Sequence, residues 1–305
     1  MTSGILNLNK PAGMTSFAVV SLVRRLTGIR RVGHAGTLDP IADGVLPICL
    51  GQATRVVEYL IGQPKVYYAR IRLGAATDTY DSEGTVTATG DASLVTEAEV
   101  SSELQGFAGE IDQLPPMYSA VKHKGQPLYR YARAGKDAPR TPRMVKVYAI
   151  TLRRFAPPVL EVEMDVGRGF YVRTLAYDLG ERLGCHAHLE GLTRTRTGPF
   201  RIEEAIGIDQ LRAAGEVGIW EELLIAPDRV LESWDAALLA EEHSREVCQG
   251  KLVLLDTSAL GRPEAVPDSS CRAYSAAGEF LGILQYLGEG LWRAEKVFAE
   301  AENRP

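Results

Sequence analysis

The part of the chain best suited to chemistry is a loop with one carboxylate and one histidine. Residues 32–50 read VGHAGTLDPIADGVLPICL, in which Asp39 follows His34 by five residues. Glycines allow turns that a β-carbon would block, and Pro40 pushes Asp39 away from helical geometry. We therefore expect a stiff loop that holds the Asp39 carboxylate in a fixed direction, as a nucleophile or general base requires. The alternative is an ordinary turn in which Asp39 bonds its own backbone.

A second group of side chains could in principle bind a metal. Cys185, His186 and His188 lie close together in the sequence. A structural zinc site usually needs four converging ligands, and no second pair of cysteines or histidines is spaced to complete this one. The zinc deaminase signature, H-x-E followed by P-C-x-x-C, is also missing. We expect no metal site.

A third group is basic and aromatic. Residues 117–154 contain ten basic residues and one acidic residue, and Tyr118, Tyr129 and Tyr131 are interleaved with the basic ones. Basic side chains contact phosphates and aromatic rings stack on bases, so this composition favours RNA binding. The alternative is a solvated charged face. The net charge of −5 does not oppose RNA binding, because residues 1–201 carry +6 and residues 202–305 carry −11.

The elements that must position these groups can be located by periodicity. Residues 159–166 alternate between apolar and acidic side chains with a period of two, and residues 145–155 form the neighbouring strand of an antiparallel pair. Further strands are expected at residues 5–8, 66–73, 85–89, 192–196, 252–255, 272–275, 279–286 and 291–298. Helices are expected at residues 16–27, 53–60, 96–104, 128–134, 174–183 and 238–248, with a mainly helical stretch from residue 208.

Length and composition predict a globular protein with more than one hydrophobic core. At 305 residues the chain exceeds the usual size of one core, so a large domain and a small one are expected. No run approaches the roughly 18 apolar residues of a membrane span. The N-terminus lacks the basic and apolar regions of a secretory signal. The four cysteines are far apart, as in a reduced cytosolic protein, so we expect a cytoplasmic location.

The motifs resemble those of one known family. The run Gly33-His34-Ala35-Gly36-Thr37-Leu38-Asp39-Pro40 strongly resembles the catalytic motif of the TruB family of tRNA pseudouridine synthases. Similar family segments are Leu8–Ser16, Lys65–Tyr67 before Arg72–Gly74, Met117–Lys122, Gly169–Thr174 and Gly278–Gly282. The resemblance covers nearly the whole chain.

The resemblance implies roles for individual residues. Asp39 takes the position of the catalytic aspartate, Tyr67 that of the active-site tyrosine, and Arg173 that of the arginine paired with the aspartate. Tyr171 matches a tyrosine that contacts the substrate, and Leu192 matches an apolar contact. We also expect RNA contacts from His34, Lys10, Lys122 and Arg130.

The resemblance also implies an architecture. It is an α+β pseudouridine synthase fold, with a mixed, largely antiparallel central sheet flanked by helices. Residues 1–230 would form the catalytic domain, including an RNA-gripping basic insertion at 117–146. Residues 231–305 would form a small, β-rich, PUA-like RNA-binding domain.

The implied reaction converts uridine-55 in the TΨC loop of tRNA to pseudouridine. It is an isomerisation, so no cofactor is expected, and the uridine must be flipped out of its stack. Asp39 could attack covalently or remove a ribose proton, and the sequence does not distinguish these. The expected partner is the T-arm of tRNA, bound by a monomer. One alternative is a non-catalytic RNA-binding or tRNA-folding protein of the same fold. Another is the guide-RNA-dependent, dyskerin-type relative, which the absence of obvious basic extensions disfavours.

Overall fold

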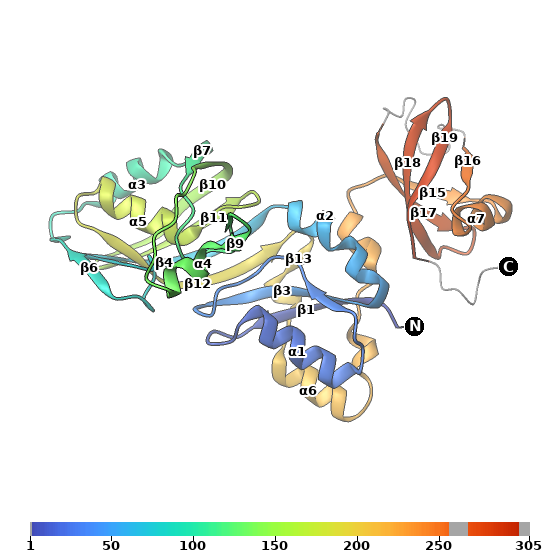
Figure 1. Cartoon of the computed structure of the whole chain (residues 1–305), viewed down its shortest axis with the longest axis horizontal. Coiled ribbons are helices and arrows are strands. Elements are labelled where there is room, and N and C mark those ends of the chain that lie inside the picture. The colour runs from blue at the N-terminus through green and yellow to red at the C-terminus, as the bar shows by residue number, and fades with distance from the viewer. Residues whose placement is uncertain (1, 256–267, 299–305) are drawn as a thin grey trace.

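The described residues form one large sheet, one small sheet and two two-stranded ribbons, one of which lies in a projecting insertion. The computed structural model describes residues 2–255 and 268–298. Figure 1 shows an elongated molecule in which a ten-stranded sheet occupies the body and a five-stranded sheet forms a separate lobe at one end. No helix in these two described ranges is long and apolar enough to span a membrane.

The large sheet is mixed, and most of its strand pairs are antiparallel. Its main path runs through β14 (Ile206–Gly207), β1 (Gly4–Lys10), β3 (Ala42–Leu50), β12 (Ala187–Thr197), β4 (Lys65–Leu73), β11 (Val159–Val166), β10 (Arg143–Ala156) and β7 (Gly109–Gln113). Two short strands pair off this path, β2 (Val32–His34) with β3 and β13 (Phe200–Arg201) with β12. Only the β1–β14 and β3–β12 pairs are parallel. The predicted alternation in β11 is confirmed, since every second side chain is buried.

Two hydrophobic clusters form on one face of this sheet. In the first, α5 (Val172–Arg182) and α3 (Glu97–Gln105) pack on β4, β10, β11 and β12. In the second, α1 (Ser16–Thr27) and α6 (Ile208–Glu216) pack on β1 and β3. The predicted ends of α1 are confirmed, because the Thr15 side chain caps its start and Gly28 ends it in a left-handed conformation.

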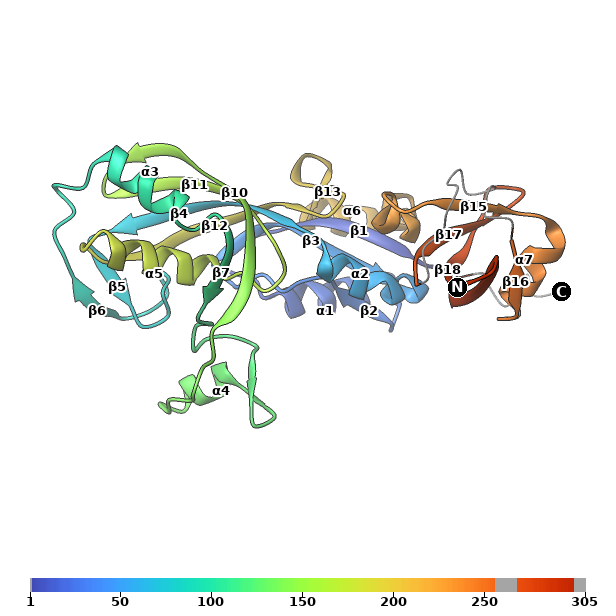
Figure 2. The ribbon, with the colours of Figure 1, turned by 90° about the horizontal axis from the view of Figure 1, so that it is seen from above.

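The basic insertion leaves the body between β7 and β10. It contains a two-stranded ribbon, β8 (Lys122–His123) and β9 (Gln126–Pro127), followed by α4 (Leu128–Arg133). Figure 2 shows that it projects from the side of the sheet that carries α1 and α5. A second excursion, β5 (Ala75–Thr77) and β6 (Val86–Thr89), forms a separate hairpin next to β4.

The small lobe is held against the body by specific contacts. Its strands are β15 (Ala236–Leu239), β17 (Ser270–Ser275), β18 (Phe280–Gly288), β19 (Leu291–Val297) and β16 (Leu252–Leu254), in that spatial order. The 3-10 helix η1 (Gly51–Val56) and α2 (Val57–Gly62) meet this lobe. Arg55 donates a hydrogen bond to the Val297 carbonyl (2.5 Å), and the Tyr59 hydroxyl donates to Glu295 (2.8 Å).

The expected helix over residues 238–248 is wrong at its start. Leu238 and Leu239 belong to β15, and α7 spans only Glu241–Cys248. β15 pairs in parallel with β17, which is far away in the sequence, and local periodicity cannot reveal such a pairing. The expected helix at 53–60 is also divided, because its first part is the 3-10 helix η1. Residues 256–267 and 299–305 of the expected second domain lie outside the described residues.

Candidate functional site

The loop that carries Asp39 is held by the first residue of α1 and by the turn before it. The Ser16 hydroxyl accepts a hydrogen bond from the Leu38 amide (2.9 Å) and donates one to the Leu38 carbonyl (3.0 Å). The Gly13 amide donates to the Pro40 carbonyl (2.8 Å). Because both neighbours of Asp39 are tied to the same segment, the backbone of Asp39 has little freedom to move.

A buried arginine holds the loop from the other side. Arg194 on β12 donates to the Val45 carbonyl (2.8 Å) and to the Gly36 carbonyl (3.0 Å), so its guanidinium joins the two ends of the loop. Its side chain is almost completely buried. At Gly44 the chain has a φ of +100°, and a β-carbon there would lie 2.3 Å from the Arg194 carbonyl oxygen. Only glycine permits this close pairing of β3 with β12.

Arg173 joins the loop to α5. Its Nη2 atom lies 2.9 Å from the Asp39 carboxylate and donates to the Tyr118 carbonyl at 2.8 Å. Its Nη1 atom donates to the Thr79 carbonyl (3.2 Å) and lies 3.6 Å from the Asp81 carboxylate. Each of the two terminal nitrogens of the guanidinium therefore has two acceptor groups, one of them a carboxylate.

The exposure of these side chains indicates which of them can meet a substrate. The side chains of Arg173 and Asp81 are each 6% exposed, whereas that of Asp39 is 41% exposed. The guanidinium thus contacts Asp39 from the interior and leaves the rest of the carboxylate accessible. A carboxylate held in this way can act as a nucleophile or a base on a molecule that arrives from solvent.

Tyr67 and Leu192 lie where the two hydrophobic clusters meet. Both are half-buried, and both pack against the α5 cluster and against the α1 cluster. The register of β4 and β12 pairs Leu192 with Ala69 and Arg194 with Tyr67. The two expected site residues therefore lie together on the face of the sheet that also carries α5 and α1.

Tyr171 and His34 lie close to the charged groups of the site. Tyr171 is the residue before α5, and its backbone exchanges two hydrogen bonds with the Gln113 side chain. Burial raises the pKa of its hydroxyl, and Arg143, Arg173 and Asp39 act on it more weakly. Burial also lowers the pKa of His34, and Arg194 adds to this effect, so both favour the neutral imidazole. The buried Nδ1 atom of His34 has no hydrogen-bond partner among the described residues.

The three expected basic contacts differ in exposure. Lys122 and Arg130 are exposed on the insertion. Lys10 is fully buried, and its ammonium donates to the Pro11 and Met14 carbonyls (3.0 and 2.7 Å). Lys10 therefore stabilises the turn at residues 11–14, and the Gly13 amide of this turn binds the Pro40 carbonyl.

Asp81, Thr79 and Arg194 are parts of the site that the sequence interpretation did not identify. The segment around Asp81 lies between the expected strands at 66–73 and 85–89 and had no expected role, and Arg194 was expected only to lie in a strand. The contacts of the buried Arg194 with the Gly36 and Val45 carbonyls depend on the register between β3 and β12, which local sequence patterns do not reveal.

The residues considered as metal ligands point to other partners. The His186 Nδ1 atom is 2.6 Å from Glu181, and the His188 Nδ1 atom is 2.8 Å from the Ala75 carbonyl. Within residues 2–255 and 268–298, no group of three or more His, Cys, Asp or Glu side chains could hold a metal ion.

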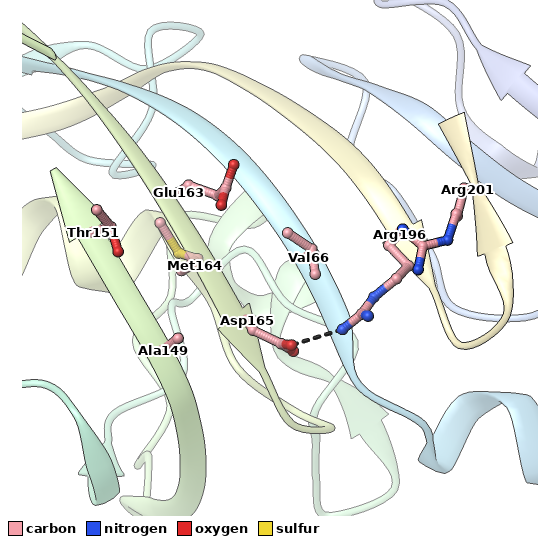
Figure 3. A pocket seen from close by; sticks show the side chains of 8 residues that line it. All are labelled: Val66, Ala149, Thr151, Glu163, Met164, Asp165, Arg196 and Arg201. Carbon is pink, nitrogen blue, oxygen red and sulfur yellow. Dashed lines mark hydrogen bonds and ion pairs between the residues drawn. The ribbon is translucent and has the colours of Figure 1, made fainter. Parts of the chain in front are cut away.

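An open hollow of about 260 Å³ lies on the opposite face of the sheet from Tyr67. Figure 3 shows its lining, which includes Val66, Glu163, Asp165 and Arg196. Adjacent residues of a strand point to opposite faces, so Val66 faces away from the side of Tyr67 and α5. The Asp165 carboxylate is paired with Arg196 at 2.6 Å. This hollow is separate from the Asp39 site.

The fold of this chain is shared with a chain of a solved structure. The chain superimposes on a chain of the crystal structure of a Cbf5-Nop10-Gar1 complex with a TM-score of 0.77 and 26% identity, covering 100% of this chain and 87% of that one. The expected α+β architecture, with a mixed central sheet and a β-rich C-terminal part, is confirmed. This fold, together with the match of residues 24–172 to a family model of pseudouridylate synthases, defines the class of the protein as pseudouridine synthase.

Family comparisons give a narrower assignment. Residues 24–172 match the TruB family pseudouridylate synthase N-terminal domain, and residues 173–239 match the tRNA pseudouridylate synthase B C-terminal domain. A protein of Dehalococcoides mccartyi named tRNA pseudouridine synthase B is 42% identical over 99% of this chain and 98% of its own length. A protein of the same name from Thiobacillus denitrificans is 41% identical over 92% of this chain and 91% of its own length. This chain belongs to the TruB family of pseudouridylate synthases.

Proposed function

We propose that this protein isomerises uridine-55 in the TΨC loop of tRNA to pseudouridine, with Asp39 as the reacting carboxylate. In this reaction the bond between N1 and C1′ breaks and a bond between C5 and C1′ forms. The C5 proton leaves and N1 gains a proton, so the product has the same composition as the substrate. No oxidant or reductant is consumed.

The observation that carries this proposal is the contact between Asp39 and Arg173. The guanidinium lies 2.9 Å from the carboxylate and is shielded from solvent, so it holds the carboxylate in one orientation. The exposed side of the carboxylate is free to reach the ribose of a flipped uridine, either by covalent attack or by proton removal. Unstacking the uridine costs a few kcal/mol, which contacts with the rest of the RNA must offset.

The remaining site residues have roles that follow from their positions. Tyr67 would stack on the flipped uracil, and its hydroxyl, which makes no hydrogen bond to a described residue, could take part in proton transfer. Tyr171 and Leu192 would complete the pocket for the base, and His34 would contact nucleotides beside it. Lys10 would act indirectly, through the turn it stabilises.

The insertion and the small lobe would provide most of the RNA surface. Lys122 and Arg130 of the insertion 117–146 would contact the phosphates of the T-arm, which is the expected partner. Residues 1–230 would act as the catalytic domain and residues 231–305 as a PUA-like RNA-binding domain. We expect a monomer that acts in the cytoplasm.

The test is tritium release from a tRNA transcript labelled at C5 of its uridines, with no guide RNA present. The proposal expects release of one equivalent per tRNA and none from a transcript in which uridine-55 is replaced by cytidine. Binding without release would instead support a non-catalytic RNA-binding protein. Release that requires an added guide RNA would support the dyskerin-type alternative.

A further inference from the structure

Two tyrosines from different elements stack beside the Arg173 site. The rings of Tyr80 and Tyr177 are nearly parallel, with their centroids 4.1 Å apart and an angle of 24° between their planes. Tyr80 lies in the loop between β5 and β6, and Tyr177 lies on α5. Neither ring belongs to any of the hydrophobic core clusters formed by the described residues. General packing of the core therefore does not explain this contact.

Tyr80 has an unfavourable backbone conformation. Its φ is +65°, in the left-handed region that residues with a β-carbon rarely adopt. Such conformations persist only where surrounding contacts impose them, and they are frequent at functional sites. The loop backbone supplies some of these contacts, because the Tyr80 amide donates to the Thr77 carbonyl and the Tyr80 carbonyl accepts from the Leu189 amide.

The residues on both sides of Tyr80 bind the catalytic arginine. The Thr79 carbonyl accepts a hydrogen bond from Arg173 Nη1, and the Asp81 carboxylate lies 3.6 Å from the same nitrogen. Asp81 is also held within its loop by the Thr79 hydroxyl (2.5 Å) and the Glu83 amide (3.1 Å). The conformation of residue 80 therefore decides whether both acceptors can face Arg173 at once.

The helix contributes the second half of this arrangement. Tyr177 follows Arg173 by four residues on α5, so the two side chains lie on the same face of the helix. One face of α5 thus presents a guanidinium to residues 79 and 81 and an aromatic ring to residue 80 between them. An aromatic stack in this place fixes the loop directly against the helix that carries the arginine.

We propose that the Tyr80–Tyr177 stack is a positioning device that keeps Thr79 and Asp81 against Arg173, and through Arg173 keeps Asp39 oriented. The inference rests on the proposed function, because it assigns a purpose to the stack in that reaction. Tyr80 and Tyr177 are positioning residues and need not touch the substrate.

The first test is kinetic and uses ring removal with conservative rescue. Tyr177→Ala should lower the single-turnover rate of tritium release between about 2- and 12-fold, the worth of one aromatic pair. Its dissociation constant for tRNA should not change. Tyr177→Phe keeps the ring and should restore the wild-type rate. Tyr68→Ala is the matched control, since it removes a partly exposed tyrosine from the opposite face of β4, and its rate should equal that of the wild type.

A second variant separates the effect of the Tyr80 ring from the effect of the backbone conformation at residue 80. Tyr80→Asn removes the ring, but asparagine tolerates a positive φ better than most residues, so the loop can still form. It should slow the reaction as Tyr177→Ala does. In the background of Asp81→Asn the same change should have a smaller effect, because both act on Arg173. Fully additive effects, or a weakened affinity for tRNA with an unchanged rate, would overturn the proposal. The latter result would mean that the rings stack on RNA.

A measurement that needs no activity distinguishes failure of this inference from failure of the proposed function. Amide hydrogen exchange of residues 77–84 in the free protein should be faster in Tyr177→Ala than in the wild type and in Tyr177→Phe. Equal exchange in all three would overturn the inference even if the enzyme is active. If exchange is faster in Tyr177→Ala but the wild-type protein releases no tritium, the stack does hold the loop and the proposed function is refuted.

Discussion

Replacing Arg173 by lysine tests how far catalysis depends on the geometry of the guanidinium rather than on its charge. Arg173→Lys keeps one positive charge near Asp39. A lysine ammonium is compact, however, and cannot reach Asp39, Asp81 and both carbonyl acceptors from one position. The variant therefore removes the orientation of Asp39 while preserving most of the local electrostatics.

The size of the effect follows from the contacts that are lost. Hydrogen bonds to charged groups contribute about 1.5–3 kcal/mol each. If the lysine loses one such contact that the transition state needs, the single-turnover rate should fall about 10- to 150-fold. Affinity for tRNA should change little, because the side chain of Arg173 is only 6% exposed and offers the RNA almost no surface.

The assay is single-turnover tritium release with enzyme in excess, together with filter binding for the dissociation constant. The control is Arg182→Lys on the same helix. Arg182 forms a solvent-exposed ion pair with Glu103 (3.7 Å), and lysine keeps the positive charge of that pair. Thermal denaturation of both variants shows whether each is folded at the assay temperature. A wild-type rate in a folded Arg173→Lys protein would refute the argument that the guanidinium orients Asp39.

Three further predictions concern the support of the site and its RNA surface. Gly44→Ala should lower the free energy of unfolding by about 3 kcal/mol, because the added β-carbon would collide with the Arg194 carbonyl and because alanine disfavours the positive φ of this position. Urea denaturation measures this change, and unchanged stability would contradict it. Burial lowers the pKa of Lys65 to about 8 from an ordinary value of 10.5. Between these two pH values the unfolded chain holds a proton at Lys65 that the folded protein has lost, so the contribution of Lys65 to stability should rise with pH, by on the order of 1 kcal/mol per unit, and be flat below pH 8. Denaturation at several pH values should show this rise as a change in the stability difference between the wild type and Lys65→Met, and a difference that does not vary with pH would contradict it. Lys122→Gln and Arg130→Gln should each weaken tRNA binding and reduce the slope of log affinity against log salt by about 1; an unchanged slope would show that the residue does not contact phosphate.

The sequence predicted those parts of the fold that depend on local patterns. The alternation of residues 159–166 is visible without a structure, and so is the capping box of α3, in which Thr96 and Glu99 satisfy each other's backbone groups. The Asp39 loop was found because its glycines and its proline restrict the backbone locally. The contact between Asp39 and Arg173 was expected only from the family resemblance.

The rest depends on contacts between distant parts of the chain. Asp81 reaches Arg173 only because the β5–β6 hairpin folds back onto α5. Arg194 reaches both ends of the Asp39 loop only because β12 lies beside β3 in one register. The error at residues 238–239 has the same origin, since two leucines next to a helix look like its first turn until a distant strand is known to pair with them.

The most direct test of the central claim is tritium release by Asp39→Asn beside the matched variant Asp43→Asn. Both changes remove one negative charge and keep the shape of the side chain, at Asp39 in the loop and at Asp43 near the start of β3, which follows the loop. The account predicts that Asp39→Asn binds tRNA like the wild type but releases no tritium, whereas Asp43→Asn retains activity. Release by Asp39→Asn at the wild-type rate would contradict the account.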